Sequence, residues 1–252
     1  MIRLKTRDEI QRIKEASLIL IDTFDALKKI VSPGITTAEL DKFACDFIIK
    51  RGGRPAFLGY MDYTAGLCTS VNQEVIHGIP NQRPLQEGDI LSLDCGVDLN
   101  GYISDAAVTL PLGKISREAQ RLMTVTEECL YRAIDQVKPG NRVRHISEAV
   151  FGHAKEHGYG VVHQFCGHGV GFDLHEEPQI PNYVSSGPNP RLKNGMVIAI
   201  EPMINQGTGD IVILDDGWTV ETGDGLLSAH FEHTVAIVDD QAEILTSRDT
   251  YL

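Results

Sequence analysis

The sequence has 252 residues, 42% of them hydrophobic and 23% charged, and its formal net charge is −12 at pH 7. This is the composition of an ordinary soluble globular protein, large enough to bury a substantial core as one large domain or two small ones. No apolar run approaches the roughly 20 residues of a membrane span, and the charged N-terminus lacks the apolar segment of a secretory signal. Five scattered cysteines with no CxxC pair exclude a disulfide framework, and the acidic balance disfavours broad binding to nucleic acid. We therefore expect a cytoplasmic protein with no DNA partner and no membrane partner.

Two amphipathic helices begin the chain. Apolar or small residues recur at 3–4 spacing over residues 10–31, and Pro33-Gly34 ends this pattern. Thr36 and Glu39 form a capping box for a second helix, which stops at Gly52-Gly53. A second pair of helices is predicted later in the chain. One covers residues 116–137 and ends before Pro139-Gly140, and the other covers residues 143–157 and ends before Gly158.

Strand-like segments follow each pair of helices. They are rich in β-branched and apolar residues and cover residues 67–71, 90–97, 102–110, 197–201 and 230–238. Each half of the chain thus reads as helix, helix and strands. We expect an α+β protein with helices outside and strands inside.

The second half also resembles the first half in sequence. LQEGDILSLD (residues 85–94) matches LKNGMVIAIE (192–201) at an offset of 107. VSPGITTAEL (31–40) matches VKPGNRVRHI (137–146) at an offset of 106. Chance similarity between common helix-turn patterns is the alternative, but two matches in the same order favour a duplication. Two related halves would face each other with a site between them.

Four strand carboxylates lie opposite the more hydrophobic face of their strands, because strand side chains alternate. They are Asp94, Asp105, Glu201 and Glu232. Each of them could face water on a half-exposed sheet, but if the hydrophobic faces meet the helices, the carboxylates meet in the middle. Clustered carboxylates repel one another unless cations neutralise them, and two divalent ions would balance four of them. Together with His168, they form a mixed set that suits iron, manganese, cobalt or zinc.

Seven short sequence motifs, which occur in this order along the chain, carry a resemblance to a known family: NQEVIHGIP, LSLDCG, YISDAA, CGHGVG, LHEEP, IAIEPM and FEHT. Over essentially the whole chain, the sequence resembles the methionine aminopeptidases, and among them the short bacterial form of type I. We find no segment that could be the helical insertion of the second type. The resemblance implies the pita-bread fold, with two pseudo-symmetric halves that have an inner curved antiparallel sheet and outer helices. It implies a single catalytic domain over 1–252, with halves of roughly 1–112 and 113–252.

The same resemblance implies the metal ligands. Asp94, Asp105, His168, Glu201 and Glu232 would bind two divalent ions per chain, with Asp105 and Glu232 bridging. Metal-activated hydroxide would attack the first peptide carbonyl, and Glu201 would also shuttle protons. The implied activity is removal of the initiator methionine from nascent proteins whose second residue is small, so the expected partners are peptides that begin with Met.

Two further histidines, His77 and His175, would contact the substrate and stabilise the tetrahedral intermediate by hydrogen bonding. For His175, a surface loop position is the alternative. The other histidines are expected to be structural or surface residues: His145, His153, His157, His163, His230 and His233.

A pocket for the methionine side chain should be apolar and lined by aromatic residues. The positions that match are Tyr60, Tyr63, Cys68 and Trp218, although core packing is an alternative for Tyr60 and Tyr63. Phe57 is expected to line the same pocket, but there the sequence departs from the family pattern. Phe57 stands where bacterial relatives commonly have Cys, and Leu174 stands where they commonly have Phe. An exchange of size across one pocket could conserve its volume.

Other functions and partners remain open at this point. A Xaa-Pro aminopeptidase or prolidase of the same fold is the main alternative, and a non-catalytic binding protein is the second. The N-terminal segment has five cations that could contact ribosomal RNA transiently: Arg3, Lys5, Arg7, Arg12 and Lys14. A solvated helix face is the simpler interpretation of these cations. We expect a monomer.

Overall fold

The computed structural model describes residues 1–248. Its α-helices within that range are α1 (Arg7–Ile30), α2 (Thr37–Lys50), α3 (Arg117–Ile134) and α4 (Val143–Glu156). All the predicted helices are confirmed. Helix α1 begins three residues earlier than its apolar pattern suggested, because Thr6 and Glu9 form a capping box at its first turn. No helix among the described residues is long and apolar enough to cross a membrane.

The strands are antiparallel to their neighbours throughout the described pairings. The central nine-stranded sheet has the order β1-β4-β5-β14-β9-β7-β8, with β2 paired to β4 and β15 paired to β14. Its strands are β1 (Arg54–Pro55), β2 (Cys68–Val71), β4 (Ile90–Leu99), β5 (Tyr102–Pro111), β7 (Gly167–Gly169), β8 (Glu176–Ile180), β9 (Val197–Ile200), β14 (Glu232–Val238) and β15 (Gln241–Ile244).

Two three-stranded sheets and one short helix complete the fold. The first sheet joins β13 (Ser228–His230), β10 (Met203–Asn205) and β6 (Gly160–Val161), and the second joins β11 (Ile211–Ile213), β12 (Val220–Thr222) and β3 (Glu74–Ile76). The short 3₁₀ helix η1 covers Tyr60–Asp62.

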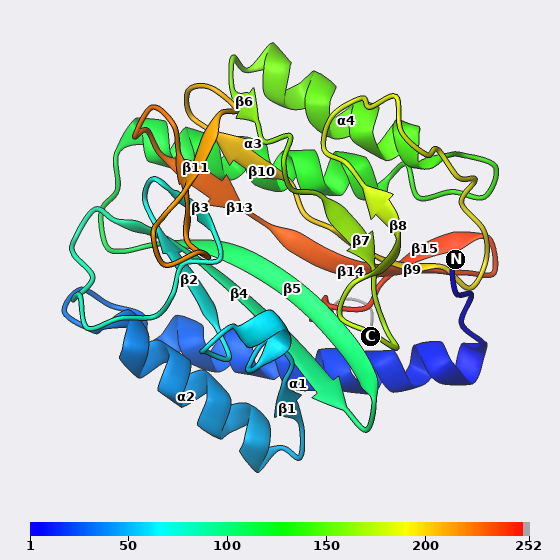
Figure 1. Cartoon of the computed structure of the whole chain (residues 1–252), viewed down its shortest axis with the longest axis horizontal. Coiled ribbons are helices and arrows are strands. Elements are labelled where there is room, and N and C mark those ends of the chain that lie inside the picture. Colours follow the sequence, from blue (N-terminus) through cyan, green and yellow to red (C-terminus); the bar gives the residue numbers. More distant parts are fainter. Residues whose placement is uncertain (249–252) are drawn as a thin grey trace.

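Helices α1 and α2 cover one part of the central sheet, and α3 and α4 cover another part, as Figure 1 shows. Leu91 and Leu93 of β4 pack in a core with residues of α1 and α2. Ile198 of β9 and Val235 of β14 pack in another core with residues of α3 and α4. The hydrophobic strand faces therefore meet the helices, as predicted, and the opposite faces are free to form a site.

The predicted duplication is visible in the backbone. Gly34 and Gly140 both adopt positive φ, at 97° and 91°. Gly88 and Gly195 do the same, at 94° and 86°. Glycine enters this left-handed region without strain, so the four glycines make equivalent turns in the two halves.

The equivalent loops also pair in the same way. A single antiparallel bridge joins Thr36 to Pro84 in the first half, and another joins Arg142 to Arg191 in the second. These bridges are related by the sequence offsets of 106 and 107. The predicted α+β architecture with two pseudo-symmetric halves is confirmed.

One predicted strand is wrong as a single element. Residues 230–238 form the end of β13 and all of β14, which lie in different sheets, with a break at Phe231. The Thr109 hydroxyl lies 2.7 Å from the His230 carbonyl oxygen and 3.0 Å from the His230 backbone nitrogen. A side chain thereby satisfies both backbone groups of His230, and the chain changes its strand partner there.

Candidate metal centre and substrate cavity

Strand register brings three of the predicted carboxylates onto one face of the sheet. Asp94 of β4 lies opposite Ala107 of β5, and Ala107 lies opposite Glu232 of β14. Asp105 precedes Ala107 by two residues, so its side chain shares that face. The Thr234 hydroxyl donates to the Asp105 carbonyl at 2.7 Å and holds this part of β5 against β14.

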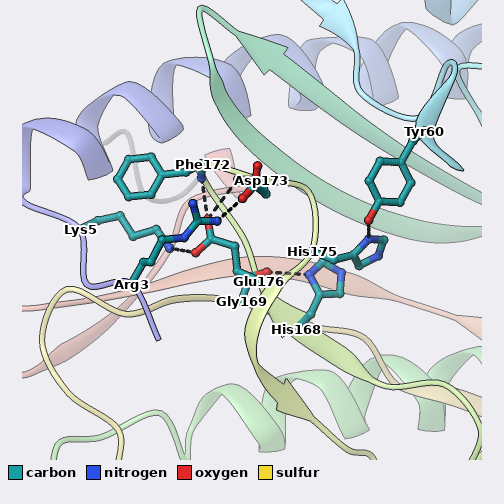
Figure 2. Close-up of polar contacts among 9 residues, drawn as sticks. All are labelled: Arg3, Lys5, Tyr60, His168, Gly169, Phe172, Asp173, His175 and Glu176. Atoms are coloured by element: carbon teal, nitrogen blue, oxygen red, sulfur yellow. Dashed lines mark hydrogen bonds and ion pairs between the residues drawn. The ribbon is translucent and has the colours of Figure 1, made fainter. Parts of the chain in front are cut away.

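His168 and Glu201 reach the same point from β7 and β9. His168 Nε2 lies 3.5 Å from Glu201 Oε1 and 4.0 Å from Asp105 Oδ2. Nδ1 of His168 donates to the Gly169 carbonyl, 2.9 Å away, as Figure 2 shows. Because this contact places the ring proton on Nδ1, the lone pair of Nε2 faces the carboxylates, which is how a metal-ligating imidazole is commonly held.

Burial makes this group of acids hard to ionise without cations. It raises the pKa of Asp94 to about 7 and the pKa of Glu201 to about 8. Burial, and then repulsion from neighbouring carboxylates, raises the pKa of Asp105 and of Glu232 well above the ordinary range. Each charged form is disfavoured because it leaves water and meets like charge.

The donor set fits divalent metal ions. Ligand atoms of Asp105, His168 and Glu232 all lie within 4.8 Å of one another. Buried carboxylate oxygens of Asp94, Asp105 and Glu232 have no hydrogen-bond partner among the described residues, and such atoms call for an explanation such as an ion. Burial lowers the pKa of His168 to about 3, so this imidazole is neutral and cannot balance the carboxylates. Neutral imidazole with carboxylates suits iron, manganese, cobalt or zinc.

Sequence reasoning missed one residue at this centre. His230 was expected to be structural or at the surface, but it is 1% exposed and its Nε2 lies 3.7 Å from Glu201 Oε2. Both of its ring nitrogens lack a hydrogen-bond partner among residues 1–248. Its place two residues before Glu232 was the available signal, because strand residues at that spacing share a face.

All twelve predicted site residues line one cavity. The apolar and aromatic part consists of Phe57, Tyr60, Tyr63, Cys68 and Trp218, and the polar part consists of His77, Asp94, Asp105, His168, His175, Glu201 and Glu232. Met61 and Phe165, which were not predicted, also line this cavity. The cavity therefore combines an apolar pocket with the acidic centre, as a site for an apolar side chain beside a hydrolytic centre requires.

The two histidines that were expected to face the substrate are held differently. His77 adopts φ of 59°, which is unusual for a residue other than glycine, and its ring packs edge-on against Phe165 and Trp218. His175 is exposed at the cavity rim, where its Nδ1 lies 2.7 Å from the Tyr60 hydroxyl, as Figure 2 shows. The rings of His168 and His175 are 4.3 Å apart.

The Phe57 ring occupies space that a glycine leaves open. A Cβ atom on Gly96 would lie 2.8 Å from Phe57 Cε1, so any side chain at residue 96 would displace the ring. Leu174 lines the same cavity and belongs to the same cluster of buried residues as Phe57. The larger side chain of Phe57 and the smaller side chain of Leu174 therefore share one pocket.

Behind His175, an ionic network fixes the loop that carries it (Figure 2). The Glu176 Oε1 accepts from the backbone N–H groups of Phe172 and Asp173 at 2.7 and 3.1 Å. Its Oε2 accepts from Lys5 Nζ at 2.6 Å. Arg3 pairs with both Asp173 and Glu176. The N-terminal segment is thus tied to the loop that presents His175.

Comparison with known proteins is consistent with this geometry. A model of metallopeptidase family M24 matches residues 11–239, and the chain belongs to that family.

Among its relatives in the family, methionine aminopeptidase of Clostridium perfringens is 49% identical over 246 residues, covering 98% of this chain and 99% of the relative. The crystal structure of methionine aminopeptidase from Rickettsia prowazekii has a TM-score of 0.95 and 37% identity, covering 98% of this chain and all of that one. The predicted pita-bread fold and the resemblance to methionine aminopeptidases are confirmed. Prolidase from Pyrococcus furiosus is less similar, with a TM-score of 0.77 and 25% identity, and only 65% of that chain is covered.

Proposed function

We propose that the chain is a metal-dependent aminopeptidase that removes N-terminal methionine from peptides and nascent proteins whose second residue is small. The observation that carries this proposal is the single cavity in which an apolar, aromatic pocket adjoins a buried centre of carboxylates and imidazole. Relatives that are nearly half identical over nearly their whole length and bear the name methionine aminopeptidase support the same substrate.

Five residues would hold two divalent ions: Asp94, Asp105, His168, Glu201 and Glu232. In this proposal, Asp105 and Glu232 would contribute to holding both ions. Such ions supply Lewis acidity toward a peptide carbonyl and make water a stronger acid. Glu201 faces both His168 and His230 across 3.5 and 3.7 Å, and it would accept the proton from water and pass it to the leaving amine.

His77 and His175 would act on the substrate. Burial lowers the pKa of His77 to about 4, so its ring is neutral near pH 7 and can donate one hydrogen bond from one nitrogen. The contact between His175 Nδ1 and Tyr60 leaves Nε2 for the peptide. Donors aimed at the carbonyl oxygen stabilise the charge that develops there.

The apolar part of the cavity would hold the methionine side chain. Its walls in this proposal are Phe57, Tyr60, Tyr63, Cys68 and Trp218. Tyr63 and Trp218 pack edge to face with ring centroids 5.0 Å apart, which fixes both rings. A flexible thioether makes favourable contacts with such ring edges.

Several further features are proposals of the same kind. We propose one catalytic unit over residues 1–252, with halves of roughly 1–112 and 113–252; the last four residues lie outside the described ones. We also propose that the chain works as a monomer in the cytoplasm, with ions chosen from iron, manganese, cobalt and zinc.

A transient ribosome contact through the N-terminal cations also stays a proposal, with one correction. Lys5 is 5% exposed and pairs with Glu176, so it cannot reach an RNA phosphate. Arg7 pairs with Asp239 and Arg12 lies over the Tyr102 ring, so these cations already have internal partners. Charge reversal of Arg7 and Arg12 should weaken co-sedimentation with ribosomes at low salt if the contact forms.

The test of the main proposal is a peptide series. Met-Ala, Met-Gly and Met-Ser peptides should be cut with far higher kcat/KM than Met-Leu or Met-Lys peptides, because the proposed activity requires a small second residue. Equal kcat/KM across the series would reject the assignment. Preferential cleavage of Xaa-Pro peptides would instead support a prolidase-like activity, and failure to bind any divalent metal would support a non-catalytic protein.

A further inference from the structure

We propose that the outer helices of the chain carry a second metal site, which binds zinc or a similar divalent ion. The site consists of Glu128 on α3 and of His153 and His157 at the end of α4. It uses none of the residues of the metal centre or the substrate cavity, so it is independent of the proposed peptidase activity.

The geometry of the three side chains carries this proposal. Ligand atoms of Glu128, His153 and His157 all lie within 4.8 Å of one another. His153 Nε2 lies 2.7 Å from Glu128 Oε2, and the two imidazole rings are 4.5 Å apart at 62°. Two imidazoles and one carboxylate form a ligand set that binds zinc in other proteins and leaves a position for water.

The spacing of the histidines on α4 also suits an ion. His153 and His157 are four residues apart, which places them on the same face of a helix, the spacing found in helical zinc motifs. The Nδ1 of His157 donates to the His153 carbonyl at 3.0 Å. This contact places the proton on Nδ1 and leaves the lone pair of Nε2 available to a metal.

His153 is buried and only half satisfied. Its side chain is 4% exposed, and its Nδ1 has no hydrogen-bond partner in the described part of the chain. Because no second partner fixes the tautomer, the ring proton can lie on Nδ1, and Nε2 can then offer its lone pair to an ion. In the structure Nε2 donates to the Glu128 carboxylate, and a bound ion at Nε2 would shift the ring proton to the unpartnered Nδ1.

The surroundings favour a cation. His153 lies in the last turn of α4 and His157 is its C-cap, where the exposed carbonyls carry the negative end of the helix dipole. A hollow beside His153 is lined by the carboxylates of Asp135, Glu148 and Glu156 and by one guanidinium, that of Arg132. A Cβ atom added to Gly152 would meet nothing within 4 Å, so the hollow is open at that point.

The two helices are held together independently of any ion. The Cys129 thiol, next to Glu128, donates to the Val150 carbonyl at 3.6 Å. Leu130 and Ala154 belong to the same buried core. Helices fixed in this way keep the three ligands near one another before an ion binds, so little conformational entropy is lost on binding.

One small rearrangement is required. Two ligands about 2.1 Å from a tetrahedral ion lie roughly 3.4 Å apart, whereas Glu128 Oε2 and His153 Nε2 are 2.7 Å apart. The Glu128 side chain is 48% exposed, so its carboxylate can move outward by that difference. The bound ion would replace the hydrogen bond between the helices with two coordinate bonds, and would clamp α3 to α4.

The experiment measures total metal per chain after dialysis of the manganese-loaded enzyme against a buffer that contains manganese and zinc. Wild-type protein should retain one more equivalent than the His157→Ala and Glu128→Gln variants. Glu128→Gln keeps the side-chain volume, so it remains informative if His157→Ala folds poorly. Zinc should also raise the unfolding temperature of wild-type protein more than that of either variant, because an ion that binds only the folded state stabilises it.

Matched controls are His145→Ala at the start of α4 and Glu127→Gln, the neighbour of Glu128 on α3; both should retain the wild-type metal content. Zinc should shift the imidazole NMR signals of His153 and His157, and kcat/KM of His157→Ala should equal that of wild type. Equal metal content in wild type and both site variants would overturn the proposal. Equal loss in the control variants would overturn it as well.

Discussion

Lys5 and Glu176 form an ion pair inside the protein, with Nζ 2.6 Å from Oε2 and with the two side chains 1% and 2% exposed. Burial lowers the pKa of Lys5, although Glu176 opposes this effect. The same carboxylate accepts hydrogen bonds from the backbone N–H groups of Phe172 and Asp173, in the loop before His175. The pair therefore connects the N-terminal segment to a side chain of the cavity.

Replacement of Lys5 by methionine should affect both stability and turnover. Lys5→Met removes the buried cation of Glu176 and leaves the partly exposed Arg3 as a partner, so the free energy of unfolding should fall by up to about 3–5 kcal/mol. The loop that positions His175 should then move, so kcat should fall while metal content stays constant. Denaturant unfolding, metal analysis and steady-state kinetics measure the three quantities.

The double variant Lys5→Met/Glu176→Gln is the control for Lys5→Met. It removes both charges, so it should recover part of the stability that the single variant loses. If Lys5→Met unfolds at the wild-type denaturant concentration and keeps the wild-type kcat, the buried pair does not support the loop.

The two histidines of the segment FCGHGVGFDLHEEP should separate in their effects. His168→Ala would remove one of the proposed metal ligands, so metal affinity should fall and excess metal should partly restore activity. In the proposed mechanism His175→Ala would remove a hydrogen bond to the developing oxyanion, so kcat should fall by roughly 10²–10³ at unchanged metal affinity. Calorimetric metal titration beside steady-state kinetics distinguishes the two cases. Equal loss of metal affinity in both variants would place His175 in the metal shell instead.

Phe57 and Leu174 should behave as a coupled pair. Phe57→Cys leaves a void in the pocket, and Leu174→Phe overfills it, at a cost of about 1–3 kcal/mol. Each single variant should lower kcat/KM for Met-Ala-Ser. The double variant Phe57→Cys/Leu174→Phe should recover much of it, because the ring moves into the space that Phe57 leaves. Additive losses in the double variant would show that the two side chains do not share the methionine subsite.

His77 should make the protein less stable in acid. Burial lowers its pKa to about 4 in the folded state, whereas an unfolded histidine titrates near 6.5. Between these pH values the unfolded state binds more protons, so stability is full above pH 6.5 and is lost as the pH falls toward 4. The contribution that disappears between pH 7 and pH 4.5 is about 2–3 kcal/mol.

This loss is isolated by comparing wild type with His77→Gln in urea unfolding at both pH values. The variant lacks the titrating ring, so its free energy of unfolding should fall less than that of wild type over the same interval. A parallel fall in the two proteins would mean that His77 takes up its proton in the folded state with an ordinary pKa.

The order of elements was predictable because each boundary is set by local chemistry. Pro33-Gly34, Ser116 and the capping box of Thr36 and Glu39 act within a few residues of the ends they define. The break at Phe231 was not predictable, because it depends on the Thr109 hydroxyl, which is more than a hundred residues away. The alternation of apolar and polar side chains, taken alone, predicts a single strand over residues 230–238.

The candidate site was predictable to a similar depth. The alternation of Asp94, Asp105 and Glu232 against apolar residues placed them on one face, and the register of β4, β5 and β14 does bring them together. The place of His230 two residues before Glu232 was a signal in the sequence, but the approach of its ring to Glu201 was hidden, since it depends on how the chain folds. The positive φ of His77 and the support of His175 by Lys5 were hidden for the same reason.

The division of the chain into two equivalent halves has a consequence for synthesis. Asp94 and Asp105 belong to the first half, and His168, Glu201 and Glu232 belong to the second, so neither half holds a complete donor set. Glu232 lies on one of the last strands, β14, between β5 and β9. A growing polypeptide therefore cannot bring these side chains together until β14 has left the ribosome, and a chain that ends before β14 would lack Glu232, one of the proposed ligands.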